Sequence, residues 1–262
     1  MVMGPTHAMS GAAAGMIVAE LLPQRWGGPS SIAETFVWGG VCAGAALLPD
    51  LDLPHSTVAR AFGTASQGAA KALNTASALF YRATRTPTDN HRDPGHRTLT
   101  HTLLFAVTVG AGVSALIAGI GKPIIGLTLF LMLGLALRGL ASDWTKQVGP
   151  PSVMAATAAL TAAAWISMPA ATGSTSLGLM ITIGCITHCL GDGITKEGIP
   201  FLAPFVVING KRWWEFALPS ILRIRANGTF EKLALLPGLT ATTAVVAVIA
   251  VAPAVTSATT AR

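Results

Sequence analysis

Residues 175–192, TSLGLMITIGCITHCLGD, form an apolar run that ends with a histidine and an aspartate. Its length approaches the roughly 20 residues that a helix needs to cross the hydrocarbon core of a bilayer. If the end of the run is helical, His188 and Asp192 lie on one face, because they are four residues apart. Two such donors on one face can bind the same metal ion. The stretch predicts a membrane helix that carries part of a metal site.

Further long apolar segments precede and follow this one. Together they cover residues 7–22, 32–49, 101–121, 123–141, 151–168, 175–191 and 233–253. The chain is 52% hydrophobic and 11% charged, which is unusual for a soluble domain. We therefore expect an all-α, polytopic membrane bundle of about six or seven spans, forming a single integral membrane domain over residues 1–262. The first segment contains Glu20, which favours a tilted or partial span.

The order of the segments brings their polar ends together. If each segment crosses once, the first leaves one side of the membrane just after His7, and the second returns to it at Asp50. The third leaves again at His101, and the sixth returns with His188. Ionisable groups at membrane depth are costly and tend to be functional. We expect a metal site with seven ligands: His7, Asp50, Asp52, His96, His101, His188 and Asp192.

Local spacing suggests how these ligands are presented. Pro49 and Pro54 discourage a helix around Asp50 and Asp52, and an extended segment would place both carboxylates on one side. His96 and His101 are five residues apart, which suits a loop that caps the following helix better than one continuous helix.

The positive charges are distributed unequally about the predicted membrane. The net charge is +6. On the side of the metal site lie Arg60, Lys71, Arg82, Arg85, Arg92, Arg97, Arg138, Lys146, Lys196, Lys211, Arg212, Arg223, Arg225 and Lys232, and on the other side lie Arg25, Lys122 and Arg262. By the positive-inside rule, the metal site faces the cytoplasm. The excess of positive charge is therefore explained by the orientation of the protein in the membrane. We expect no nucleic-acid partner.

Two segments on the site side are not expected to span the membrane. Small and apolar residues between Val58 and Leu79 form one helical stripe, which predicts an amphipathic helix over 57–82 that lies on headgroups or packs on the protein. Residues 205–232 form a predicted cytoplasmic loop, in which Asn209-Gly210 and Asn227-Gly228 each indicate a tight hairpin. Trp213 and Trp214 would then lie at the level of the headgroups.

Small residues and cysteines occur inside the apolar segments. Gly11–Gly15 and Gly40–Gly44 follow a small-xxx-small pattern that would let the first two helices approach closely. Cys42, Cys185 and Cys189 do not form a disulfide framework at membrane depth. Cys189 adjoins His188 and is conceivable as a soft ligand, but small core residues are the commoner role.

Four motifs in order resemble those of a known family. They are Thr6-His7, Pro49-Asp50-Leu51-Asp52-Leu53-Pro54, His96-Arg97-x-x-Thr100-His101 and His188-x-x-x-Asp192-x-x-Thr195-x-x-Gly198, with an echo at Gly228-Thr229-x-Glu231. The set resembles the YdjM-like bacterial inner-membrane metal-dependent hydrolases. The resemblance implies a helical hydrolase of the bacterial inner membrane, loosely akin to zinc-dependent phospholipase C enzymes. Lys196-Glu197 departs from the family pattern, where many relatives carry an aromatic or similar residue.

The ligand types indicate the metal and the chemistry. Mixed imidazole and carboxylate donors suit zinc best, then manganese or iron, and seven donors are enough for one or two ions. Water acidified to a pKa of about 7 by the metal would be the nucleophile, and no catalytic side chain is assigned beyond it. Arg97 is the first candidate to bind a substrate phosphate, although snorkelling to headgroups is an equal alternative, and Lys196 is the second.

These features favour a membrane-bound hydrolase of a lipid or lipid-linked ester, most simply a phosphoester. Two alternatives remain open. Histidine and aspartate within spans also line the pathways of metal transporters and channels. A membrane scaffold with a purely structural metal would use the same residues. Sequence leaves the oligomeric state and the lipid open.

Overall fold

The computed structural model describes residues 2–90, 92, 95–168 and 174–260, with the backbone alone at 174 and 253–260. This part of the chain forms eight α-helices and no β-strand, which confirms the predicted all-α class. The helices are α1 (Gly4–Leu21), α2 (Ile32–Ala45), α3 (Thr64–Thr84), α4 (Leu103–Ile120), α5 (Lys122–Leu140), α6 (Ser142–Ser167), α7 (Ser174–Gly193) and α8 (Leu236–Thr260). Short 3-10 helices at Leu48–Asp52 and Leu99–His101 and a π-helical turn at Glu231–Leu235 lie at the ends of this bundle.

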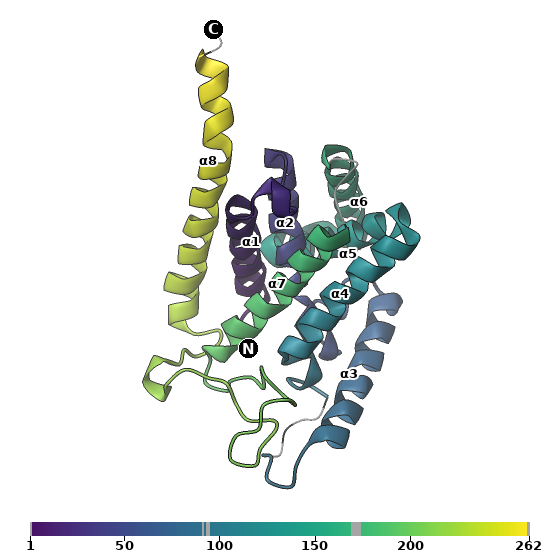
Figure 1. Cartoon of the computed structure of the whole chain (residues 1–262), viewed down its shortest axis with the longest axis vertical. Helices are drawn as coiled ribbons and strands as arrows, with labels where there is room; N and C mark the ends of the chain where they lie inside the picture. The colour runs from purple at the N-terminus through teal and green to yellow at the C-terminus, as the bar shows by residue number, and fades with distance from the viewer. Residues whose placement is uncertain (1, 91, 93–94, 169–173, 261–262) are drawn as a thin grey trace.

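Four segments of the described chain are long and apolar enough to cross a membrane. They are Ile32–Asp52, Leu103–Ile120, Lys122–Leu140 and Glu231–Ala252. The other predicted spans also form helices, α1, α6 and α7, in the same bundle (Figure 1). Glu20 lies in α1, and α6 is broken at Gly149, where φ is +77° and two prolines follow. The bundle is therefore a membrane bundle, with four clear candidate spans and three further helices, of which α6 is broken.

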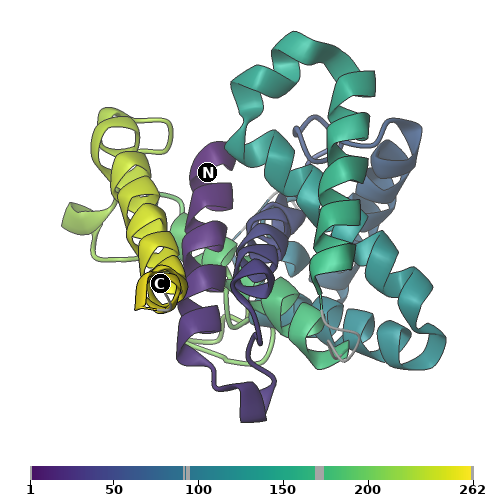
Figure 2. The same ribbon diagram turned by 90° about the horizontal axis from the view of Figure 1, so that it is seen from above.

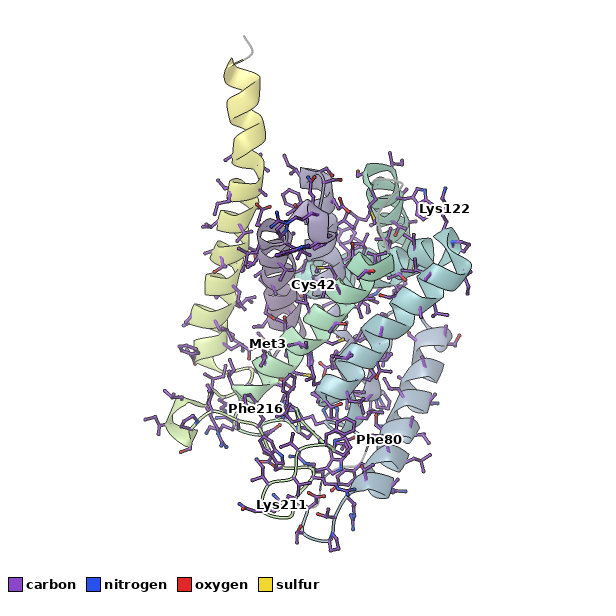
Figure 3. The ribbon with its side chains drawn as sticks, in the orientation of Figure 1. Met3, Cys42, Phe80, Lys122, Lys211 and Phe216 are labelled. Carbon is purple, nitrogen blue, oxygen red and sulfur yellow. The ribbon has the colours of Figure 1, made fainter. Side chains whose placement is uncertain are left out.

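The polar loops gather at one end of the molecule. In Figure 1 the N-terminus, α3 and the loop between α7 and α8 all lie at the lower end of the bundle. Lys211 lies at this end and Lys122 at the opposite one (Figure 3), as the unequal charge distribution predicts. Helix α8 stands at the edge of the bundle, mainly beside α1, in both views (Figures 1 and 2). The ends of α2 and α7 and the start of α1 thus meet the loops at one place.

Glycines allow the central helices to approach closely. A Cβ atom at Gly11 would lie 2.6 Å from the carbonyl oxygen of Cys42, and one at Gly15 would lie 2.6 Å from Cys42 Cβ. The pattern on α1 therefore packs against α2, as predicted. The pattern on α2 was assigned to the wrong partner, because Gly40 and Gly44 face α5 instead. One helix of small residues can pack on two neighbouring helices, and the spacing alone does not say which of these helices each glycine faces.

The accessory segments are confirmed in part. Helix α3 forms over Thr64–Thr84 and buries Ala70, Ser77 and Tyr81, so that one face packs on the protein. At Asn209-Gly210 a tight turn with positive φ at both residues joins Ile208 to Lys211, as expected for a hairpin.

Two expectations for this region were wrong. Asn227-Gly228 leads into a helix rather than a hairpin, because the Glu231 carboxylate accepts a hydrogen bond from the Asn227 backbone N–H at 2.6 Å and stabilises the helix start. Trp213 is 1% exposed and packs edge-on against Phe80 and Tyr81. Burying its indole between α3 and the loop removes more apolar surface from water than a headgroup position would.

We predict that Gly11→Ala destabilises the protein by about 1–3 kcal/mol, because its methyl group would overlap the α2 backbone. The matched control is Gly112→Ala on α4, where a Cβ meets no atom within 4 Å among the described residues. There alanine is expected to be neutral or stabilising. Thermal melting of the purified variants tests the difference, and equal melting temperatures would disprove the close approach of α1 and α2.

Candidate metal centre

Five of the seven predicted ligands lie together, where α1 begins and α7 ends. They form two groups whose donor atoms lie within 4.8 Å of one another: His7, His188 and Asp192 in one, and Asp50, His101 and His188 in the other. All five are buried. His188 belongs to both groups, so the two share a centre. These residues come from the start of α1, the 3-10 helix after α2, the 3-10 helix before α4, and the end of α7.

The distances between donors fit a shared ion. His188 Nε2 lies 3.3 Å from His101 Nε2, and His7 Nε2 lies 3.3 Å from Asp192 Oδ1. His101 Nε2 is 3.6 Å from Asp192 Oδ2, and His188 Nε2 is 3.7 Å from Asp50 Oδ1. Metal–ligand bonds of 2.0–2.2 Å in a tetrahedral arrangement place ligands about 3.3–3.6 Å apart. The centre therefore has the dimensions of a coordination site.

Hydrogen bonds orient two of the imidazoles. His188 Nδ1 lies 2.8 Å from the Ala46 carbonyl oxygen, which can only accept, so Nδ1 carries the proton and Nε2 offers its lone pair to the centre. The Thr100 hydroxyl donates to Asp52 Oδ2, and His101 Nδ1 lies 2.9 Å from the same hydroxyl. Because the hydroxyl proton is already donated to Asp52, His101 Nδ1 must carry the proton and donate it to the Thr100 oxygen. Nε2 of His101 is then unprotonated and, like that of His188, faces the centre. Hydrogen-bonded carboxylates behind metal-binding histidines are common.

Asp52 and His96 are not in either group of donors within the described chain. Asp52 Oδ1 lies 2.8 Å from His96 Nδ1, and Oδ2 receives the Thr100 hydroxyl. Burial lowers the pKa of His96, but the hydrogen bond and charge of Asp52 outweigh it and raise that pKa above its ordinary value. The pair lies behind His101, where it can support that histidine, and its predicted role as two metal ligands stays a prediction.

The expectation that Asp50 and Asp52 share one side was wrong. Leu48–Asp52 is a 3-10 helix, in which Pro49 is accommodated in the first turn. With three residues per turn, side chains two residues apart point in directions that differ by about 120°. Asp50 therefore faces the centre while Asp52 faces His96 and Thr100.

The two predicted substrate-binding residues are placed differently. Arg97 is buried, with Nη2 2.7 Å from Asp192 Oδ2 and Nη1 2.7 Å from Glu197 Oε2. Its guanidinium thus fixes the orientation of Asp192. The Lys196 side chain is exposed, and its backbone carbonyl accepts from Arg223. Neither residue is thereby tested as a phosphate ligand, and both roles stay predictions.

Sequence reasoning missed the role of Glu231. This carboxylate is fully buried and accepts backbone hydrogen bonds from Met3 and Asn227, each at 2.6 Å. The Val2 N–H also donates to Asp192 Oδ1 at 3.0 Å. Together these bonds fix the start of α1 and so the position of His7. The available signals were the motif echo at Gly228-Thr229-x-Glu231 and the position of this glutamate just before an apolar segment.

Unsatisfied buried atoms indicate that a cation fits the centre. Among the described residues, both ring nitrogens of His7 and Asp50 Oδ1 are buried without a hydrogen-bond partner. Buried polar atoms without a partner are rare and costly, and a metal ion would satisfy His7 and Asp50 together with the other donors. Cys185 and Cys189 are buried free thiols that belong to neither donor group.

We predict that His188→Ala and Asp192→Ala each remove most of the bound metal, because each deletes a buried donor at the centre. His55→Ala is the matched control, since His55 is exposed. Metal content of the purified variants measured by inductively coupled plasma mass spectrometry tests this. If both α7 variants kept the wild-type metal content, the bound metal would not lie at this centre.

Comparison with known proteins places the whole chain in one family. No curated protein and no solved structure matches it. The family model described as YdjM inner membrane protein matches residues 1–154 and 151–260. The motifs that hold His7, Asp50, His101 and Asp192 all lie within these matches. The chain belongs to the YdjM inner membrane protein family.

Proposed function

We propose that this protein is a membrane-bound, metal-dependent hydrolase of a lipid or lipid-linked phosphoester. The observation that carries the proposal is the buried centre of three histidines and two aspartates, His7, His101, His188, Asp50 and Asp192, at one end of a membrane bundle. A structural ion could use the same ligands, but Asp50 also borders a cavity, so one side of the centre faces a space that a substrate could enter. That access supports catalysis.

The donor set favours zinc, with manganese or iron as alternatives. Nitrogen and oxygen donors without thiolate suit these metals. His188 is common to both donor groups, so one central ion or two adjacent ions can be held. A divalent metal held there would acidify water to a pKa of about 7 and stabilise negative charge on a substrate oxygen.

The remaining residues of the site position this chemistry. Arg97 holds Asp192 through an ion pair, and Thr100 links His101 to the Asp52 carboxylate. Glu231 anchors the start of α1 through Met3. Since these groups are buried, the ligands are held in place before substrate binds, which lowers the reorganisation needed during the reaction.

The proposed orientation places this centre at the cytoplasmic face of the inner membrane. Lys211 and Lys122 lie at opposite ends of the molecule (Figure 3), and most basic residues are predicted on the Lys211 side. The positive-inside rule then supports a cytoplasmic site and a substrate taken from the inner leaflet.

Turnover by metal-loaded protein tests the proposal. Purified protein is stripped with chelator, reloaded with zinc, manganese or iron, and incubated in mixed micelles with a panel of phospholipids and lipid phosphates. We expect hydrolysis, detected by mass spectrometry of the products, to be lost on stripping and restored by metal. His188→Ala should lower turnover roughly a hundredfold or more, whereas His55→Ala should not.

Two outcomes would contradict the hydrolase. Full metal content with no hydrolysis of any lipid in the panel would favour a structural metal. Metal flux into proteoliposomes, without hydrolysis, would favour a transporter.

A further inference from the structure

A cavity of about 570 Å³ lies beside the metal centre. Its wall includes Asp50, the loop that follows the 3-10 helix after α2, the end of α5, and the bend of α6 at Gly149 and Pro150. Apolar side chains such as Leu47, Leu135 and Val153 also line it. A volume of this size suits a small ligand or the headgroup of a lipid.

The cavity has an excess of positive charge. Arg60, Arg138 and Lys146 line it, against the single carboxylate of Asp50. Lys146 is paired with Asp143, which is not part of the wall, at 3.1 Å. Cationic groups around an apolar cavity complement an anionic, amphipathic ligand.

Arg138 is the cation best placed to bind an anion. It is half-buried, its guanidinium lies over the Phe62 ring at 5.0 Å, and Nη1 donates to the Gly134 carbonyl oxygen at 3.0 Å. No carboxylate forms an ion pair with Arg138 in the described residues. Arg97, by contrast, is already paired with Asp192 and Glu197. Arg138 therefore has donor groups left for a phosphate, which guanidinium binds well.

The position of Arg138 also suits a lipid. It lies near the end of α5, one of the four clear spans, at the end opposite to Lys122, which Figure 3 labels. The neighbouring wall is the bend of α6, where Gly149 and Pro150 interrupt the helix. A lipid can thus place its headgroup in the cavity while its chains stay beside the apolar parts of α5 and α6.

We propose that this cavity is the headgroup subsite of the enzyme, that Arg138 binds the substrate phosphate, and that the site selects lipid phosphates of net negative charge over zwitterionic phospholipids. This inference rests on the proposed function, because it takes the metal centre beside Asp50 as the reacting site. It replaces Arg97 by Arg138 as the main phosphate ligand and leaves Arg97 as a positioning residue.

Binding of ligands whose bond between phosphorus and the lipid backbone is a stable P–C bond tests the subsite, and mass spectrometry after each titration checks that the choline ester is intact. The probe is an ether-linked phosphonate analogue of phosphatidic acid with two hexyl chains, compared with its phosphonocholine counterpart and with methylphosphonate. Dissociation constants are measured by calorimetry on the zinc-loaded full chain. We expect the anionic lipid probe to bind at least about tenfold more tightly than either comparison ligand.

The variants separate the subsite from general charge effects. Arg138→Gln should weaken binding of the anionic probe by about tenfold or more, since a hydrogen-bonded charge pair is lost. Lys122→Gln, on the same helix at its other end, should bind as the wild type does. Metal content and melting temperature are measured for each. If Arg138→Gln fails to fold, the Arg60→Gln variant tests the subsite instead, because Arg60 lies at the exposed rim of the cavity. Its affinity for the anionic probe should fall by about twofold to fivefold.

Several results would overturn the inference. Equal affinity for the anionic and zwitterionic lipids would disprove the selection by charge. If methylphosphonate bound as tightly as the lipid probe, the cavity would be a phosphate site and not a lipid site. Wild-type affinity in the metal-loaded Arg138→Gln variant would disprove the role of Arg138 as the phosphate ligand. Hydrolysis of a zwitterionic lipid without dependence on Arg138 would keep the hydrolase and disprove the subsite. Arg138-dependent binding in a protein that hydrolyses no lipid would support the subsite and disprove the hydrolase.

Discussion

The structure depends on compensating the charge of two aspartates that are buried among histidines. Removing an unpaired charge from water costs several kcal/mol, so Asp50 and Asp192 are stable only with partners. Asp192 obtains them from Arg97 and the Val2 N–H. Asp50 Oδ1 has none among the described residues, although two histidine nitrogens lie within 4 Å. The remaining requirement for positive charge is what makes this cluster a candidate metal centre.

The same polar contacts join parts of the chain that are distant in sequence. Asp192 at the end of α7 holds both Val2 and Arg97, and Glu231 before α8 holds Met3. These contacts draw the start of α1 over the centre, where the His7 and His188 rings stack with centroids 3.8 Å apart. Glycines on α1 allow it to lie close enough to α2 for this to happen. Packing of small residues within the membrane and charge compensation at its edge therefore act on the same helices.

Hydrophobicity was sufficient to predict the helices and the meeting of their polar ends, because apolar length and chain order determine where each segment end lies. Side-chain direction was not predictable in this way. The 3-10 turn at Leu48–Asp52 separates Asp50 from Asp52, and the ion pairs of Arg97 depend on a loop whose course no periodicity encodes. Trp213 was misplaced for a related reason, since its burial against Tyr81 is a long-range contact. The number of spans stays a prediction, since four of the seven predicted segments have the length and hydropathy of a span in the described part of the chain.

X-ray absorption spectroscopy of the metal-loaded protein tests the central claim most directly, because it reports the ligands of the ion itself. With zinc bound, we predict a first shell of nitrogen and oxygen at about 2.0–2.2 Å, with the outer-shell scattering of several imidazoles and no sulfur. Such a shell corresponds to His7, His101 and His188 with Asp50 and Asp192. A sulfur shell at about 2.3 Å, which would require a thiolate such as that of Cys189, or a shell without imidazole, would contradict the account.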